Sequence, residues 1–292
     1  MDSKMILKRL DGIDDLPTLP TIAVEVNSML QDYDTSITKL SETIKKDQAI
    51  IPRILKLVNS SFYGFQSKVS DIGRAIVLLG FNTVRNAIVT ISIIDAFSRK
   101  GGLAGFNITD FWTHSVAVAV TSRHLAHRAR LQSPEDYFTG GLLHDIGKIV
   151  LLQYFQDLFE KVWISARENN LSFYDAEKEE IRITHARIGA HLAKKWQLPE
   201  PLVDTIRYHH AVNKTAKDLN LLMIVHVADI IVNSIMTDSK DDIDSSAIDP
   251  EAARTMKSQL ETVSTWFPEV SEEIQSACRF FLQEGAQQEV RE

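Results

Sequence analysis

The sequence predicts an all-α protein, and two observations carry that prediction. Only 12 glycines and 8 prolines occur among 292 residues, and scarce helix breakers favour long helices over many short strands and turns. Most segments also repeat their apolar residues every three or four positions, which is the period of an amphipathic helix. We therefore expect a multi-helix bundle, and the 44% of hydrophobic residues suffices for a large core in one or two domains.

Local signals bound the helices of the first hundred residues. Ser36 precedes a run with helical spacing and suits an N-cap, and Asp47 suits the cap of the next helix. Residue 70 or 71 begins another helix, which ends at Gly80, because glycine readily adopts the backbone conformation found after a helix. A longer helix is expected from about 83 to 98. Together these helices would form an N-terminal helical subdomain within residues 1–100.

The glycine-rich run 101–105 marks the clearest internal linker. It lacks the Gly-Lys-Ser/Thr ending and the preceding strand of a phosphate loop, so we interpret it as a flexible connector. A second helical bundle is expected over 105–236, followed over 237–292 by an acidic loop and a C-terminal helical extension. The acidic stretch lacks the central glycine and closing glutamate of an EF-hand loop, and we interpret it as solvated.

Composition and charge argue against several classes of function. The net charge is −7 and no long Lys/Arg block occurs, so nucleic acid is not an expected partner, because duplex binding needs a basic patch. The one cysteine, Cys278, cannot form an internal disulfide. The N-terminus lacks the apolar region of a signal peptide, and the apolar run 87–94 is too short to span a bilayer. We therefore expect a reduced, cytoplasmic protein outside the membrane.

Several histidines and two aspartates occupy unexpected positions. Five of the nine histidines lie in strongly apolar helical surroundings, namely His114, His144, His185, His209 and His210. Asp145 directly follows His144, and Asp229 lies in the middle of an apolar helix expected over 219–236. Adjacent residues of a regular helix point about 100° apart. His144 and Asp145 therefore need a wide pocket floor or a distorted turn to reach one site, and the flanking glycines permit distortion.

The buried polar side chains predict a shared centre. A buried carboxylate is costly unless it is paired or bound to a metal, so the economical arrangement is that the five imidazoles and two carboxylates meet. Such donors suit one or two ions of Zn, Fe, Mn or Ni. The competing interpretation is that an inward histidine is a hydrogen-bonded core residue, which is commoner for any single histidine. The other four are interpreted as core or surface residues: His124, His127, His191 and His226.

These residues resemble a known pattern. His114, His144-Asp145 and Asp229 look like the H…HD…D signature of the HD superfamily of metal-dependent phosphohydrolases. His185 and His209-His210 resemble the extra histidines of its HD-GYP branch, which is related to cyclic di-GMP phosphodiesterases. Four segments are similar to HDOD domains, at 16–20, 54–60, 75–80 and 185–199. The chain thus resembles the HDOD family over about residues 16–212.

The resemblance implies an HD-type helical bundle preceded by an N-terminal helical subdomain. HDOD domains are bacterial signalling modules for which catalysis is generally not established, and their partners belong to two-component, chemotaxis and cyclic di-GMP pathways. The residues after His210 lack a Gly-Tyr-Pro element, which argues against cyclic di-GMP hydrolysis. No receiver, GGDEF or EAL module is evident.

Two functions compete at this stage. The first is a non-enzymatic regulator that binds other proteins and keeps the His/Asp site as a remnant or a metal-bound staple. The second is a metal-dependent phosphohydrolase acting on a nucleotide or phosphodiester, in which Asp145 orients a metal-activated water and Lys148 pairs with the phosphate. Asp110 would then contact a further metal or, more commonly for such a residue, simply face solvent. A sensor that binds a nucleotide or metal without turnover would use the same residues.

Overall fold

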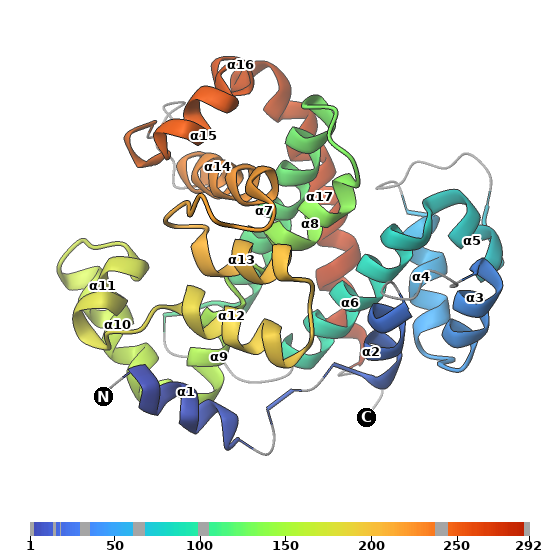
Figure 1. Cartoon of the computed structure of the whole chain (residues 1–292), viewed down its shortest axis with the longest axis horizontal. Helices are drawn as coiled ribbons and strands as arrows, with labels where there is room; N and C mark the ends of the chain where they lie inside the picture. The colour runs from blue at the N-terminus through green and yellow to red at the C-terminus, as the bar shows by residue number, and fades with distance from the viewer. Residues whose placement is uncertain are drawn as a thin grey trace.

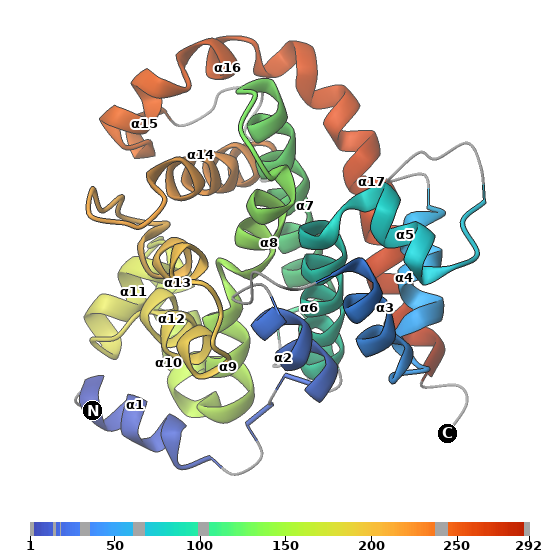
Figure 2. The same ribbon diagram turned by 45° about the vertical axis from the view of Figure 1, so that its right-hand side comes forward.

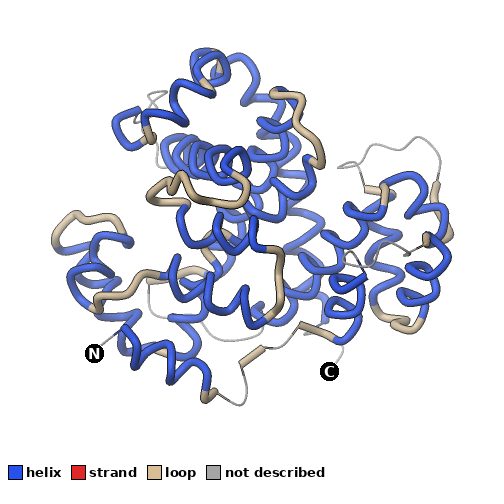
Figure 3. The backbone as a smooth tube through the Cα atoms, viewed as in Figure 1, coloured by secondary structure: helices blue, strands red, loops and turns tan. Residues whose placement is uncertain are grey.

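The computed structural model describes residues 3–13, 16–17, 19–29, 36–60, 68–98, 105–236 and 245–288. Throughout these ranges the chain folds into helices joined by loops, without a strand (Figure 3). The all-α prediction is therefore confirmed. The linker residues 101–104 and the acidic loop residues 237–244 lie outside the described residues.

The helices before residue 100 are α1 (Ser3–Asp11), α2 (Thr21–Ser28), α3 (Ile37–Lys45), α4 (Ile50–Val58), α5 (Ile72–Leu79) and α6 (Phe81–Ser98). The central part contains α7 (Ile108–Arg128), α8 (Pro134–Leu143), α9 (Ile146–Tyr154), α10 (Gln156–Glu168), α11 (Phe173–Glu180), α12 (His185–Lys195), α13 (Glu200–Tyr208) and α14 (Leu219–Met236). After it come a short 3-10 helix η2 (Ser245–Ala247), α15 (Pro250–Thr255), α16 (Lys257–Glu261) and α17 (Val263–Gln288).

Two of the helix caps expected in the first hundred residues are present, whereas the N-cap of α4 is Ala49 and Asp47 lies two residues before it. The Ser36 side chain accepts a hydrogen bond from the Lys39 backbone N–H, and Asp71 caps α5 in the same way. The Asp47 carboxylate accepts from the N–H of Ile50, where α4 begins. Gly80 ends α5 with a φ of 83°, a left-handed value that glycine adopts without strain.

Helices α2 to α6 pack on one another at one side of the molecule, and α6 connects them to the central bundle (Figures 1 and 2). Helix α1 lies apart from them, beside α9 and α12 (Figure 1). There the Asp11 carboxylate lies 2.7 Å from Nε2 of His191 on α12, and the Trp196 indole donates to the Pro17 carbonyl. The first helices therefore contact both parts of the chain.

A charged joint fastens α6 to α8. The Arg85 guanidinium and the Asn86 side-chain amide both donate to Asp136, at 2.9 and 2.8 Å. Arg85 is only 5% exposed, and burial lowers its pKa although Asp136 opposes that effect. A buried cation needs such a partner, so the joint fixes how α6 meets the bundle.

Helix α7 is the axis of the central bundle. Helices α8, α14 and α17 all pack along it (Figure 2), and its residues from Ser115 to Arg123 are buried without a break. Helix α17 also reaches α6. Its Trp266 ring stacks on His124 of α7 with the ring centroids 4.9 Å apart, so the C-terminal extension is part of the packed core.

Helix α14 is long and apolar enough to cross a membrane by length and composition, but 61% of it is buried inside the protein. That burial is typical of a core helix in a soluble protein. The buried helix predicted over 219–236 is therefore confirmed, with Asp229 in its interior at 5% exposure.

Candidate metal centre

A break between two helices brings His144 and Asp145 to the same site. Helix α8 ends at Leu143 and α9 begins at Ile146, so the two residues form a turn between them. Both side chains are buried, at 0% and 1% exposure. The turn that the adjacent pair required is therefore present.

The flanking glycines have a different role from the expected one. They have no left-handed backbone, and they serve instead as points of close helix contact. A Cβ on Gly141 would lie 2.8 Å from the backbone of Ala119 on α7, and one on Gly147 would lie 2.0 Å from the carbonyl oxygen of His185 on α12. The absence of these two methyl groups lets α7 and α12 approach the turn, which draws His114 and His185 toward Asp145.

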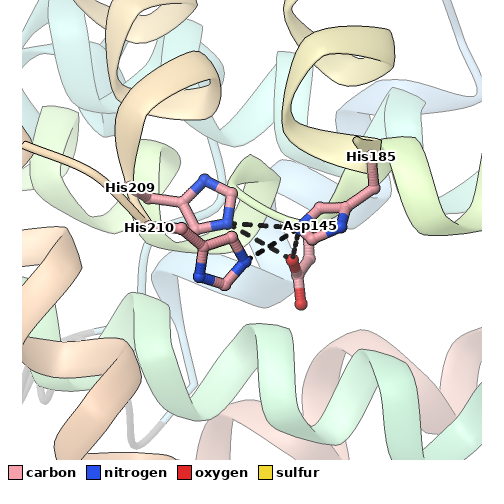
Figure 4. A group of neighbouring side chains, drawn as sticks. All are labelled: Asp145, His185, His209 and His210. Atoms are coloured by element: carbon pink, nitrogen blue, oxygen red, sulfur yellow. Dashed lines mark hydrogen bonds and ion pairs between the residues drawn. The ribbon is translucent and has the colours of Figure 1, made fainter. Parts of the chain in front are cut away.

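One oxygen of Asp145 faces a group of three histidines (Figure 4). Its Oδ1 lies 3.0 Å from Nε2 of His185 and 3.5 Å from Nε2 of His209. Nε2 of His210 lies 3.0 Å from Nε2 of His185. The four donor atoms all lie within 4.8 Å of one another.

The other oxygen of Asp145 faces a second group. Its Oδ2 lies 3.3 Å from Nε2 of His144 and 2.6 Å from Nζ of Lys148. Nε2 of His114 lies 3.9 Å from the same oxygen and 3.1 Å from the Asp229 carboxylate. Asp145 thus stands between two clusters, and the seven side chains expected to meet do so from five separate segments of the chain.

Hydrogen bonds on the far side of three rings fix their orientation. Nδ1 of His144 donates to the Gly141 carbonyl, and Nδ1 of His209 donates to the Ile206 carbonyl. Nδ1 of His185 donates to the carboxylate of Glu177 at 2.7 Å. Once its Nε2 is deprotonated, an imidazole that uses Nδ1–H in this way presents a lone pair at Nε2, and all three Nε2 atoms face the centre.

Sequence reasoning missed Glu177. Its carboxylate is fully buried on α11 and accepts both the backbone N–H and the ring N–H of His185. A carboxylate behind a histidine is the usual support of a metal ligand. The segment that contains it, Glu-Lys-Glu-Glu at 177–180, has the pattern of a solvated helix face, so only the fold shows its burial.

Opposing electrostatic effects set the protonation of the centre. Burial disfavours the charged ring of His144, but the carboxylates of Asp145 and Asp229 outweigh it and raise the pKa of His144 to about 10. Burial lowers the pKa of His209 to about 4 and also lowers that of His210. Two histidines are therefore neutral at physiological pH, while His144 holds a proton between two carboxylates.

The residues present fit a metal ion. Nε2 of His144 and Oδ1 of Asp145 are buried and make no hydrogen bond of good geometry, and their nearest polar neighbours are other candidate ligands. This arrangement is costly unless another group satisfies both atoms. Burial opposes ionisation of Asp145, yet His144 and Lys148 hold its pKa well below the usual value. Imidazole nitrogens and carboxylate oxygens are ligands of Zn²⁺ and of Fe, Mn or Ni ions. Their role as ligands stays a prediction.

Access to the centre is narrow. His144, Asp145, His185 and His209 are at most 1% exposed, whereas the side chains of His114 and Lys148 are 18% and 21% exposed. The Tyr174 ring covers His210 with the centroids 4.4 Å apart. Among the described residues, His114, Lys148 and His210 are the partly exposed side chains beside the centre, so an ion held here would reach solvent at that edge.

The remaining residues that the sequence singled out lie elsewhere. Asp110 is exposed in the first turn of α7, outside both clusters. His124 stacks on Trp266, His127 is exposed, and His191 pairs with Asp11. His226 is buried and bonds to the backbone of His209.

Comparison with known proteins identifies similar chains. A family model of the HDOD domain matches residues 16–212. An uncharacterised protein of Treponema pallidum is 28% identical over 209 residues, which is 71% of this chain and 40% of that protein. The chain thus spans less than half of that relative's length.

Two solved structures share the fold over nearly the whole chain. An HDOD domain protein of unknown function from Geobacter sulfurreducens is 26% identical, with a TM-score of 0.79 over 96% of this chain and 100% of its own. A candidate phosphohydrolase from Shewanella amazonensis SB2B is 24% identical, with a TM-score of 0.72 over 93% of this chain and 97% of its own. The similarity extends beyond residue 212 and includes the C-terminal helices.

We predict that Gly147→Ala destabilises the fold by at least about 3 kcal/mol, because its Cβ would meet backbone atoms that have no room to move. Gly140→Ala is the matched control in the same motif, since its Cβ meets only side chains, the nearest at 3.1 Å. Its cost should not exceed about 1 kcal/mol. Urea unfolding measures both, and equal stability of the two variants would contradict the close-contact role.

The raised pKa of His144 predicts a pH dependence of metal binding. A ligand nitrogen must be deprotonated, and a pKa of about 10 means that a proton competes with the metal throughout the neutral range. Apparent Zn²⁺ affinity should therefore rise by about tenfold per pH unit as pH increases from 6.5 to 8.5. Competition with a chelator of known affinity measures the slope, and a flat or falling profile is the contrary result.

Proposed function

Because this chain belongs to the HDOD domain family, we propose that it is a cytoplasmic signalling module that binds other proteins and holds one or two transition-metal ions at its His/Asp centre. The observation that carries the proposal is the burial of most of the donor set. His144, Asp145, His185 and His209 are at most 1% exposed. A closed centre suits an ion that stabilises or reports on the fold better than one that turns over a bulky phosphoester.

The donors would divide between two positions. His185, His209 and His210 with one oxygen of Asp145 form one, and His114, His144 and Asp229 form the other. When bound, the metal would supply a positive charge beside the buried carboxylates, in place of the proton that His144 otherwise holds there. Glu177 orients His185, and Lys148 neutralises Asp145. The partners we propose are proteins of two-component or cyclic di-GMP pathways.

A metal-dependent phosphohydrolase is the second candidate, and one observation favours it. Asp145 presents an oxygen to each cluster, and Lys148 lies 2.6 Å from one of them at the partly exposed edge of the centre. A cation beside a metal pair is well placed for a phosphate group. Asp145 would then orient the attacking water. The missing Gly-Tyr-Pro element after His210 weighs against cyclic di-GMP as its substrate.

Metal content tests the centre itself. We expect the purified protein to contain or take up one to two equivalents of Zn, Fe, Mn or Ni, measured by elemental mass spectrometry after dialysis. His144→Ala should remove most of this metal because it deletes a buried donor, whereas His127→Ala should retain it, since His127 is an exposed residue of the same type. A folded wild-type protein that binds none of the four ions would overturn the proposal.

Hydrolysis separates the two candidates. We expect the metal-loaded protein to cleave bis(p-nitrophenyl) phosphate no faster than metal-loaded buffer, because the ligands are closed to a substrate of that size. Comparison with His144→Ala sets the background. Turnover by the wild type that disappears in the variant would replace the regulatory proposal with the phosphohydrolase.

A further inference from the structure

We propose that His226 is a positioning residue that couples the metal centre to the segment at residues 245–256, hereafter the C-terminal anchor. The inference rests on the proposed metal centre and adds a route by which metal occupancy is communicated. His226 lies on α14, three residues before Asp229, and is 4% exposed. Neither cluster of candidate ligands includes it.

The two ring nitrogens of His226 bond to two distant parts of the backbone. Nδ1 lies 2.6 Å from the carbonyl oxygen of His209, and Nε2 lies 2.9 Å from the backbone nitrogen of Asp249. A backbone N–H can only donate, so Nε2 must accept. The ring proton therefore resides on Nδ1 and is donated to the His209 carbonyl.

This arrangement fixes the turn that carries two donors of the centre. His209 is the C-cap of α13, and carbonyls at a helix end have no partner within the helix. The His226 ring donates to the His209 carbonyl, and the side chain of His209 points its own Nε2 at Asp145. His210 follows directly. Movement of this turn would displace two nitrogen donors together.

The other end of the bridge lies in a packed element. Asp249 is the N-cap of α15, and its carboxylate accepts from the N–H groups of Glu251 and Ala252. Three side chains of the anchor itself are buried, namely Ile248, Ala252 and Met256, at 5%, 0% and 2% exposure. An ion pair of 2.7 Å between Lys214 and Glu251 joins the loop after His210 to α15 as well.

Coupling follows from these contacts. An ion that fixes the side chains of His209 and His210 would also fix the His209 carbonyl. Because His226 bonds both to that carbonyl and to the Asp249 N–H, the ion would stabilise this contact with the anchor as well. Linkage is reciprocal, so an anchor held by a partner protein would tighten metal binding by the same factor. The anchor lies beyond residue 212, where the family match ends.

Hydrogen exchange on the 292-residue chain tests the coupling. Exchange at residues 249–256 should slow at least about threefold when Zn²⁺ alone is added to the metal-free protein, while residues 37–58 in α3 and α4 should not change. Zn²⁺ binding is measured in parallel by calorimetry. No binding would overturn both the metal centre and the coupling, whereas binding without a change at 249–256 overturns the coupling alone.

The variant His226→Phe keeps the ring volume and removes both nitrogens. It should weaken Zn²⁺ binding by about tenfold, as removal of a residue supporting a ligand typically does, and abolish the exchange response. His127→Phe is the control and should do neither. Unchanged affinity with an intact response would overturn the proposal.

A spectroscopic signature provides a readout independent of the fold of the variant. Nitrogen NMR of histidine-labelled wild type should show His226 protonated at Nδ1 and unprotonated at Nε2. The opposite tautomer would overturn the bridge even if His226→Phe did not fold.

Discussion

The structure depends on two carboxylates, Asp145 and Asp229, held inside a helical core where water cannot solvate them. Isolated burial of each such charge would cost several kcal/mol, against a stability of only about 5–15 kcal/mol for a whole domain. Neighbouring histidines and the Lys148 ammonium, 2.6 Å from Asp145, offset that cost. Glycines allow the neighbouring helices to approach closely. The bundle is arranged to keep the two charges partnered, and the side chains brought together for this are of the types that could hold a metal ion.

Sequence alone supplied the residues of this centre because their chemistry conflicts with their apolar surroundings. His185 and Asp229, for example, interrupt stripes that are otherwise hydrophobic. Residues whose role depends on tertiary packing escaped detection. Glu177 lies in an acidic run typical of solvent, and His226 was one more histidine in an apolar helix.

Burial and access distinguish a regulatory metal site from a hydrolytic one. The donors with full burial lie deep in the bundle, and the partly exposed side chains at its edge belong to His114, His210 and Lys148. The protonation pattern fits a site that holds a fixed positive charge between two carboxylates. Burial keeps His209 and His210 neutral, and Asp145 and Asp229 together retain the proton of His144. A bound ion would displace that proton.

The joint of Arg85, Asn86 and Asp136 bears on how such a chain can be inherited. Asp136 lies on α8 eight residues before His144, about 12 Å along the helix axis. If recombination joined the N-terminal helices to another bundle, the buried guanidinium of Arg85 would lose its carboxylate partner unless that bundle also carried an acid in place of Asp136. The N-terminal helices and the central bundle are therefore not interchangeable. In related chains with this architecture, the residues at positions 85, 86 and 136 should vary together.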